Sequence, residues 1–498
     1  MSQSGVSLPG TVTPNIILIM TDQQRADSIR ALGAPWMQTP NLDRLAREGT
    51  AFTNCFVTSP VCVGSRASLF TGKYPHGCQV FSNFQPWEPT WVRSLAQHGY
   101  HCVNIGKMHI NPYDAPGGFH QRFVVENKDR PLFLEERDRA IYDEWDKALH
   151  ARKLVKPTRY TRYARDPEGF KQALGVFPWE LPEDMHPDNF VGDTALWWLN
   201  DRRNTDPLFL QIGFPGPHPP YDPVPHYLDR YADADIPAPL MSEGGNERQP
   251  LAQRELRQNM ARLDFDSIAW RGDATPEELV DLRRHYAANV SMIDAKVGEI
   301  MQTLDDRGYL DNALVIFTSD HADALGDYGH IQKWTMYDTV VKVPLIFWSK
   351  GTVKADRVHE DLVQMFDIAP TILECAGLPV PADFEARSLW GRLTDQAGYQ
   401  ERDVVYSELA RDHIQTGSEF IVMRRCRDWK IVLYLDDEFG ELYDLRNDPG
   451  ETRNLWDQAE QRERRDTLKS QCWLWVVGNS LRANRKPGRA PQGALRPG

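Results

Sequence analysis

Residues 15–25 read NIILIMTDQQR and join a short apolar run directly to a polar turn. Such a run is typical of a strand that is buried on both faces of a sheet. Similar runs occupy residues 207–213, 313–318 and 343–348, and a weaker one covers residues 100–105. Open α/β sheets bind ligands at the carboxyl ends of their strands, so the polar residues after these runs are candidates for a functional site.

Helical patterns lie between the apolar runs. The clearest covers residues 276–307, where Thr275 suits the N-cap and Glu278 completes a capping box. Shorter candidates cover residues 42–47 and 368–376. Strands that alternate with helices are typical of a layered α/β sheet. We therefore predict a large α/β/α sandwich around a mostly parallel mixed sheet.

The sequence pattern changes twice along the chain. Residues 119–272 are rich in Pro, Asp, Arg and Trp, and their weak periodicity predicts insertions over the sheet, which either shape a substrate pocket or elaborate the surface. After residue 388, short alternating runs and a helix at about residues 458–477 predict a smaller α+β domain with an antiparallel sheet. We place the catalytic α/β domain at residues 1–388 and the C-terminal domain at residues 389–498. The alternating runs are residues 404–409, 420–423 and 429–433.

Composition excludes some classes of protein. The 498 residues include 41% hydrophobic and 26% charged residues, as in an ordinary globular protein. The net charge of -13 argues against a nucleic-acid binder. We find neither a basic, apolar leader nor a run near the roughly 20 apolar residues of a membrane span, so we expect a cytoplasmic protein. The basic, Pro- and Gly-rich residues 483–498 are expected to be flexible or extended, and could reach a neighbouring subunit of a homo-oligomer.

The seven cysteines do not suggest a disulfide framework or a zinc knuckle, because their number is odd and their spacing irregular. Most are expected to be small buried side chains. Cys62 is the exception, for the reasons given below.

A first group of candidate residues follows two of the apolar runs. Asp22 and Gln23 follow the first run, and Asp320 and His321 follow the run that ends at residue 318. If the two strands are neighbours in one sheet, these side chains converge. Mostly oxygen ligands suit a hard cation such as calcium, magnesium or manganese, and the histidine leaves room for a transition metal. Taken singly, an Asp after a strand is more often a cap or a turn residue, so the predicted metal site depends on the convergence.

A second group lies in the segment SPVCVGSRASLFTGKYPH, which contains Cys62 and Arg66. A turn of small residues precedes a helix that we expect to begin near Ser65. A helix N-terminus attracts anions and lowers the pKa of a thiol, and an arginine can hold an oxyanion with two hydrogen bonds. The alternative is a buried cysteine beside a surface arginine.

A third group carries ammonium or imidazole side chains: Lys107, His109, His218 and Lys333. Each lies just past a predicted strand or close to the loop after Asp320. Two lysines and an arginine around one metal would form a pocket for a tetrahedral dianion, and the imidazoles could protonate a leaving oxygen. A single lysine or histidine in a loop is more often only solvated, so this prediction also depends on convergence.

Together, the motifs resemble the sulfatase family of the alkaline phosphatase superfamily, in the family's order over nearly the whole chain. PNIILIMTDQQRAD resembles its opening strand and metal-binding turn, and PVCVGSRASLFTGKYPH is similar to its nucleophile signature. GYHCVNIGKMH resembles a lysine–histidine segment that usually reads GKWH, and GPHPP matches a histidine loop. Further matching segments are TPNLDRLAREGTAFTNCF, YAANVSMIDAKVGEIM, TSDHADALGDYGHIQKWTMYDTVVKVPLIFW, DIAPTILECAG and ELYDLRNDPGETRNL.

The resemblance implies one divalent metal ion, bound by Asp22, Gln23, Asp320 and His321 with the nucleophile Cys62 as a further ligand. Calcium is the expected ion, with manganese or magnesium as alternatives. The cysteine would be oxidised to formylglycine by a formylglycine-generating enzyme. The hydrated aldehyde would then supply the attacking oxygen.

The resemblance also implies roles for the basic residues in the hydrolysis of a sulfate monoester to an alcohol and inorganic sulfate. Arg66 would hold and orient the nucleophile. Lys107 and Lys333 would bind the sulfate oxygens. His218 would protonate the leaving alcohol, and His109 would assist the collapse of the sulfated hydrate.

The chain departs from the family pattern at several positions. The usual signature is Cys-x-Pro-x-Arg, sometimes with Ala, whereas Gly64 occupies the third position here, which puts recognition by the maturing enzyme in question. Ala322 replaces the Gly that usually follows the Asp–His pair, and Met108 replaces Trp in GKWH. Gln23 stands where many members have a second Asp, and a Gln there is also similar to the phosphonate monoester hydrolase branch.

The sequence is compatible with three functions. A sulfate monoester hydrolase is favoured over a phosphonate monoester or phosphodiester hydrolase, because the latter branch has neutral hydroxyl residues where this chain has Lys107 and His109. A non-catalytic anion-binding homologue is the third alternative, and Gly64 is its only support.

Aromatic residues of the insertion could stack on a sugar or an aryl ring, or serve only in packing. The absence of an export signal favours a small imported sulfate ester over an extracellular polymer. The aromatic residues are Trp145, Trp179, Trp197, Trp198 and Tyr221.

Overall fold

The computed structural model describes residues 13–126, 128, 143–158, 165–262, 268–411 and 417–483. The tail predicted for residues 483–498 lies, apart from its first residue, outside this part of the chain.

A large mixed sheet forms the centre of the molecule. Its central strand, β1 (Asn15–Asp22), lies between β5 (Leu208–Pro217) and β6 (Ala313–Ser319) and is parallel to both. Beyond β5 follow β3 (His101–Gly106) and β4 (Gln121–Val124), also parallel. Beyond β6, β7 (Lys342–Trp348) is antiparallel to β6, and β2 (Thr50–Phe56) is antiparallel to β7. The short strands β8 (Arg357–His359) and β9 (Val363–Gln364) pair with β2 in parallel.

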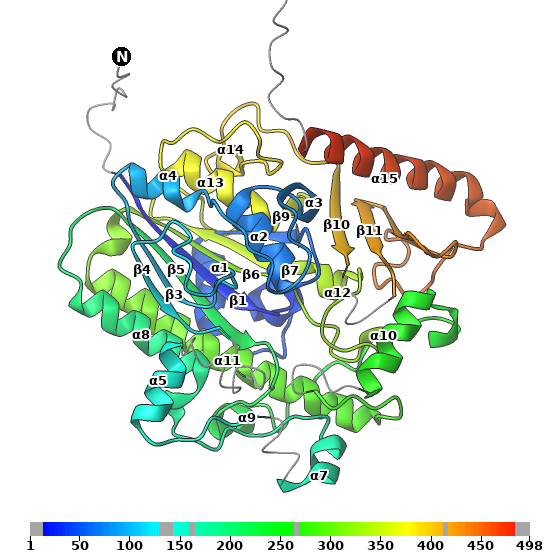
Figure 1. The fold of residues 1–498 in the computed structure, drawn as a ribbon, viewed down its shortest axis with the longest axis horizontal. Helices are drawn as coiled ribbons and strands as arrows, with labels where there is room; N and C mark the ends of the chain where they lie inside the picture. Colours follow the sequence, from blue (N-terminus) through cyan, green and yellow to red (C-terminus); the bar gives the residue numbers. More distant parts are fainter. Residues whose placement is uncertain are drawn as a thin grey trace, which may run out of the picture.

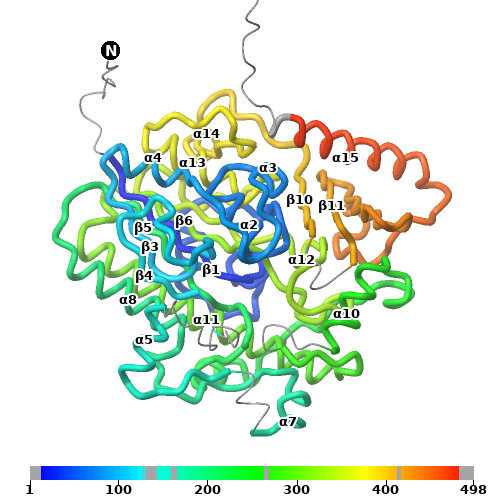
Figure 2. The backbone as a smooth tube through the Cα atoms, in the orientation of Figure 1, coloured from blue at the N-terminus to red at the C-terminus, as the bar shows by residue number. Residues whose placement is uncertain are grey.

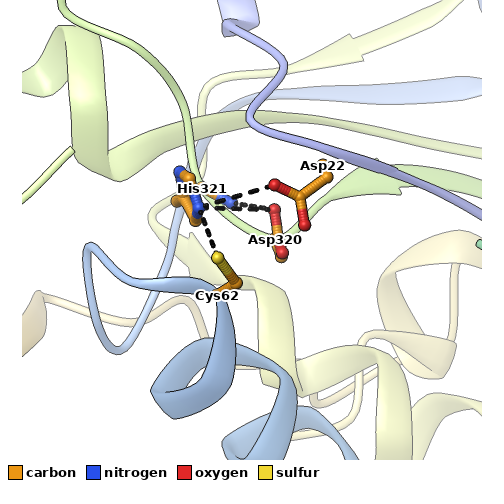
Figure 3. A group of neighbouring side chains, drawn as sticks. All are labelled: Asp22, Cys62, Asp320 and His321. Atoms are coloured by element: carbon orange, nitrogen blue, oxygen red, sulfur yellow. Dashed lines mark hydrogen bonds and ion pairs between the residues drawn. The ribbon is translucent and has the colours of Figure 1, made fainter. Parts of the chain in front are cut away.

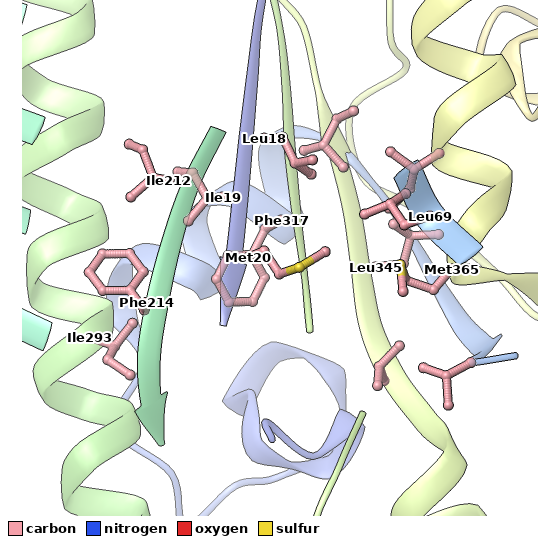
Figure 4. Packing of buried hydrophobic residues seen from close by; sticks show 14 of the residues in the cluster. Leu18, Ile19, Met20, Leu69, Ile212, Phe214, Ile293, Phe317, Leu345 and Met365 are labelled. Atoms are coloured by element: carbon pink, nitrogen blue, oxygen red, sulfur yellow. The ribbon is translucent and has the colours of Figure 1, made fainter. Parts of the chain in front are cut away.

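Helices cover both faces of this sheet, which confirms the predicted α/β/α sandwich (Figure 1). On one face lie α8 (Pro187–Asp201) and α11 (Pro276–Asp306), and on the other lie α2 (Cys62–Thr71) and α13 (Ile368–Cys375). Figure 4 shows Ile293 of α11 and Leu69 of α2 packed on opposite sides of the central strands. Burial of one such side chain contributes roughly 1.5–3 kcal/mol, so the two helical layers hold the strand ends in fixed positions.

Apart from α15 (Arg462–Ala483), described below, the remaining helices are short. None of the helices in the described part of the chain is long and apolar enough to cross a membrane. They are α1 (Pro40–Glu48), α3 (Pro75–Cys78), α4 (Val92–Gln97), α5 (Glu144–Ala151), α7 (Pro167–Gln172), α9 (Pro225–Asp229), α10 (Leu251–Arg262), α12 (Asp338–Val341) and α14 (Trp390–Leu393), besides single 3-10 turns.

A second, antiparallel sheet follows near the C-terminus and confirms the predicted α+β unit. It has the order β10 (Val404–Ala410), β11 (Phe420–Cys426), β12 (Trp429–Tyr434) and β13 (Glu441–Asp444). The helix α15 (Arg462–Ala483) packs along it (Figure 2). The ring of Trp475 stacks on Tyr406 with centroids 3.9 Å apart. The buried ammonium of Lys430 lies 2.9 Å from Asp338 in α12, so an ion pair joins this sheet to the loops of the large sheet.

Local sequence signals predicted some elements well and missed others. The capping box of α11 is present, because the Glu278 amide donates to the Thr275 hydroxyl and the Thr275 amide donates to the Glu278 carboxylate. The insertion is more regular than its weak periodicity predicts, since α8 and several shorter helices lie within it. The helix α8 is buried on the sheet and on α11, so its apolar residues do not form one stripe. The strand β2 was also missed, because its polar and apolar residues do not alternate.

The contact between His76 and Glu408 joins α3 to β10. The His76 Nδ1 lies 2.8 Å from Glu408 Oε2, and the His76 amide donates to Oε1 at 2.6 Å. Burial favours the neutral ring, but the hydrogen bond and the negative charge of Glu408 outweigh it and raise the pKa of His76. A histidine with a raised folded-state pKa stabilises the fold fully below its unfolded pKa of about 6.5, and this stabilisation is lost as pH rises through the folded value.

We therefore predict a pH-dependent effect of His76→Asn, which keeps a hydrogen-bond donor but cannot ionise. The loss of unfolding free energy should be larger near pH 6 than near pH 9, by about 1–2 kcal/mol. Chemical unfolding of both proteins across this range measures the difference. A loss that is the same at every pH would contradict a charged His76–Glu408 pair.

Candidate active site

The register of the central strands brings the first group of candidates together. Thr21 of β1 pairs with Ser319 of β6, so Asp22 and Asp320 emerge side by side at the same edge of the sheet. Potential ligand atoms of Asp22, Cys62, Asp320 and His321 all lie within 4.8 Å of one another (Figure 3). All four residues are buried. The structure thus brings Asp22, Asp320 and His321 of the first group together with Cys62 of the second group.

The donor set of this cluster fits a divalent cation. The Oδ1 of Asp22 is buried and accepts no hydrogen bond from the described residues. The Nδ1 of His321 donates to the carbonyl of Ala322 at 2.9 Å, which leaves the lone pair of Nε2 directed at the cluster. That Nε2 lies 3.9 Å from Asp22 Oδ1 and 3.8 Å from Asp320 Oδ1. Two carboxylates and one imidazole suit calcium, manganese or magnesium.

Gln23 approaches the cluster from the end of β1. Its backbone has a φ of 70°, and its amide N–H donates to Asp320 Oδ1 at 3.1 Å. The side-chain Oε1 accepts from Lys333 Nζ at 3.4 Å, so the carbonyl end of this side chain is directed into the site.

Arg66 is wholly buried and donates hydrogen bonds to the carboxylates of Asp22 and Asp320. Its Nε donates to Asp320 Oδ2 at 2.6 Å, its Nη2 donates to Asp22 Oδ2 at 3.1 Å, and its Nη1 donates to the carbonyl of Lys107 at 3.0 Å. Burial opposes ionisation of Asp22, but Lys107, His218 and other basic neighbours hold its pKa well below the usual range. None of the hydrogen bonds that the described residues give Arg66 reaches Cys62, so its direct polar contacts are with the two carboxylates and the Lys107 carbonyl.

Cys62 is the first residue of α2, which begins three residues before the start predicted near Ser65. Its Sγ lies 3.4 Å from Lys333 Nζ and 3.4 Å from His321 Nε2. Burial and the charge of Asp22 disfavour the thiolate, but Lys333, Lys107 and His321 together lower the pKa of Cys62 well below its usual value. The side chain at position 62 is therefore directed toward Lys333 and His321.

Three basic side chains of the third group converge on the same space. The Nζ of Lys333 lies 3.1 Å from His218 Nε2, and the Nζ of Lys107 lies 2.8 Å from Asp22 Oδ2. The Nδ1 of His218 donates to the carbonyl of Pro219 at 2.8 Å, so Nε2 is the ring nitrogen that faces Lys333. An anion near Cys62 would meet several N–H donors in a buried environment, where charge-assisted hydrogen bonds are strong.

His109 is the member of the group that the structure does not place among these contacts. It is partly exposed, its φ is 63°, and its amide N–H donates to both oxygens of Glu126. Its ring lies 6.5 Å from that of Tyr113. The contacts of the described residues do not connect its imidazole to Cys62, so its role remains the one implied by the motif.

The whole chain is similar to known sulfatases. The family model described as Sulfatase matches residues 14–378. The chain belongs to the sulfatase family.

A second model, described as N-sulphoglucosamine sulphohydrolase, C-terminal, matches residues 326–475 of this sulfatase. An arylsulfatase of Clostridium perfringens is 29% identical over 472 residues, which cover 92% of this chain and 93% of that protein. A choline-sulfatase of Rhizobium meliloti is 28% identical over 504 residues, covering 95% and 92%. The phosphonate monoester hydrolase of Agrobacterium radiobacter shares the fold, with a TM-score of 0.74, 24% identity and coverage of 94% and 96%. The chain is thus a sulfuric ester hydrolase of the alkaline phosphatase superfamily.

The side chain of Ser59 lies against Gly64 in this sulfatase. A Cβ added at Gly64 would lie 2.9 Å from the hydroxyl oxygen and 3.0 Å from the Cβ of Ser59. The side chain of Ser59 thus occupies the space that the Ala or Pro of the usual signature would need. The space next to Gly64 is therefore filled by the Ser59 side chain.

Most aromatic residues of the insertion pack in the core of this sulfatase. Trp145, Trp179, Trp198 and Tyr221 are at most 7% exposed, so stacking of a substrate on them is excluded in this conformation. Trp197 is 57% exposed on α8, where its ring meets Phe123 edge-on. Four of these five aromatic residues therefore serve in packing.

Asp323 is a buried residue of the site that sequence reasoning missed. It lies three residues after Asp320 in the polar segment that follows β6. A buried carboxylate in a segment of this kind has to be hydrogen-bonded, but only the tertiary structure shows its partners.

Proposed function

We propose that this enzyme hydrolyses a small sulfate monoester to an alcohol and inorganic sulfate, with Cys62 converted to formylglycine and one divalent metal bound. The observation that carries the proposal is the position of Cys62 Sγ, 3.4 Å from both Lys333 Nζ and His321 Nε2 and beside two buried carboxylates. The proposed nucleophile, the proposed cation site and the N–H donors for an oxyanion would therefore share one buried space, as displacement at sulfur requires.

The proposed metal ligands are Asp22, Gln23, Asp320, His321 and residue 62. Calcium is the expected ion, and manganese and magnesium are the alternatives. When bound, the ion would polarise a sulfate oxygen and stabilise negative charge. Formylglycine, when formed, would supply the attacking oxygen through its hydrate.

The chain's own basic residues would bind and orient the ester. Lys107 and Lys333 would donate hydrogen bonds to sulfate oxygens, and Arg66 would keep the carboxylates directed at the cation. His218 would protonate the leaving oxygen through Nε2, because its Nδ1 is held by the Pro219 carbonyl. His109 would act as a second acid–base group, the role that the family motif implies.

Sulfate is preferred to phosphonate because Lys107 and His109 are present in this chain. The fold shared with a phosphonate monoester hydrolase keeps that activity as the alternative. Turnover of matched aryl sulfate and aryl phosphonate substrates tests the choice. Sulfate hydrolysis should be faster, and a much higher rate on the phosphonate would overturn the proposal.

The proposed acid is tested by His218→Ala with two sulfate esters that differ in their leaving groups. The rate on an unactivated alkyl sulfate should fall about 10²–10⁴-fold, since the leaving alkoxide then departs without a proton. The rate on a nitrophenyl sulfate should fall far less, because that anion is already a good leaving group. Equal losses on both esters, measured as kcat, would contradict protonation by His218.

Conversion of Cys62 is tested by the mass of its proteolytic peptide from protein made in the native host. A lighter peptide that reacts with a carbonyl reagent would support formylglycine and the action of a formylglycine-generating enzyme. An unmodified thiol in active protein would favour direct cysteine chemistry. A protein that binds sulfate esters and hydrolyses none would be the non-catalytic alternative.

A further inference from the structure

We infer that Asp323 is a positioning residue that sets the polarity of the Gln23 amide and joins the loops that carry His218 and Lys333. The inference rests on the proposed function for the metal ion, and it goes beyond the proposed ligands to the group that orients one of them.

The carboxylate of Asp323 is fully buried and accepts four hydrogen bonds. Its Oδ2 accepts from Gln23 Nε2 at 2.5 Å and from the hydroxyl of Tyr221. Its Oδ1 accepts from the backbone amides of Leu325 at 2.9 Å and Gln332 at 2.8 Å. None of the ion pairs among the described residues includes this side chain, so its direct side-chain partners are these four hydrogen-bond donors.

The contact with Gln23 decides which end of that amide faces the metal site. A carboxylate only accepts hydrogen bonds, so it selects the Nε2 end of the side chain. The Oε1 end is then directed the other way, where it lies 3.4 Å from Lys333 Nζ and can serve as a cation ligand. If the amide were turned around, its NH₂ group would face the cation and could not bind it.

The other contacts of Asp323 hold two further functional segments. Tyr221 lies three residues after His218 on the loop that follows β5, and Gln332 directly precedes Lys333. Leu325 and Gln332 have φ values of 46° and 59°, in the left-handed region. The backbone amides of both residues donate to the same oxygen, Oδ1 of Asp323. One buried side chain thus contacts the three segments that supply Gln23, His218 and Lys333.

Exchanging the amide and the carboxylate between residues 23 and 323 tests the inference. Asp323→Asn keeps an oxygen for the two backbone amides but presents an NH₂ group to Gln23, which should turn the Gln23 amide around. Calcium affinity, measured by titration calorimetry with Ca²⁺ alone, should fall about 10–100-fold. Adding Gln23→Glu should then raise the affinity at least about tenfold, because one carboxylate oxygen at position 23 can accept from the new NH₂ group while the other faces the cation. With Asp323 retained, Gln23→Glu should not raise it, since two carboxylates would face each other.

The matched control is Asp294→Asn, at another buried carboxylate that accepts backbone amides, those of Asn41 and Leu42. It should leave calcium affinity unchanged. If wild-type protein binds no Ca²⁺, the proposed metal site fails and this inference fails with it. If wild type binds Ca²⁺ and Asp323→Asn binds it equally well, or if Gln23→Glu has the same effect in both backgrounds, this inference alone is overturned.

A second measurement does not depend on the folding of Asp323→Asn. In wild-type protein with ¹⁵N-labelled glutamine, the Gln23 side-chain amide signals are identified by their absence in Gln23→Glu. Their hydrogens should exchange slowly with solvent in the Ca²⁺ complex, because Nε2 donates to a buried carboxylate. Free exchange of these hydrogens in the Ca²⁺ complex would overturn the inference.

Discussion

Cys62→Ala is expected to lower kcat/KM for sulfate esters by about 10⁴-fold or more, the scale at which loss of a nucleophile acts. The variant removes only Sγ, so the cations and carboxylates around position 62 remain. Binding of a sulfate ester should therefore persist while turnover is lost. Steady-state kinetics and equilibrium binding of the same ester measure the two effects.

A suitable control is Cys472→Ala, which removes another buried thiol, on α15. Its kcat/KM should remain near that of the wild type. Unchanged ester hydrolysis in Cys62→Ala would show that the nucleophile is assigned to the wrong residue. Loss of both binding and turnover would show that the variant had damaged the pocket itself.

Arg66→Met is expected to destabilise the protein by about 3–5 kcal/mol when no divalent cation is present. The guanidinium is the donor that bridges Asp22 and Asp320, and all three side chains are wholly buried. Its removal leaves two neighbouring carboxylates with less compensating charge. Chemical unfolding in the presence of a chelator measures the loss.

Added Ca²⁺ should restore part of the stability of Arg66→Met, because the ion neutralises the same carboxylates. The matched control is Arg47→Met, since the Arg47 side chain is 66% exposed and lies 3.9 Å from Asp43. Its effect should be within about 0.5 kcal/mol. If Ca²⁺ stabilised neither wild type nor Arg66→Met, the two carboxylates would not form the proposed metal site.

Much of the site was predictable because its residues follow strongly marked strands. The apolar run before Asp22 and the run before Asp320 predicted where two strands end, and parallel pairing then placed both carboxylates at one edge. Cys62 and Arg66 were predictable from one segment, because a helix N-terminus positions a thiol and an arginine one turn apart by local geometry. The roles of these residues came from the family resemblance.

The sequence by itself determined the main buried strands, the long helix α11, the residue types available for chemistry and the family. Only the tertiary structure decided that Arg66 contacts Asp22 and Asp320, that Ser59 fills the space beside Gly64, and that Asp323 orients Gln23. Periodicity and capping act over a few neighbouring residues, so they can be read along the chain. The partner of a buried charge is selected by desolvation and hydrogen-bond geometry between segments that meet only when the sheet has formed, about 300 residues apart in the case of Asp323 and Gln23.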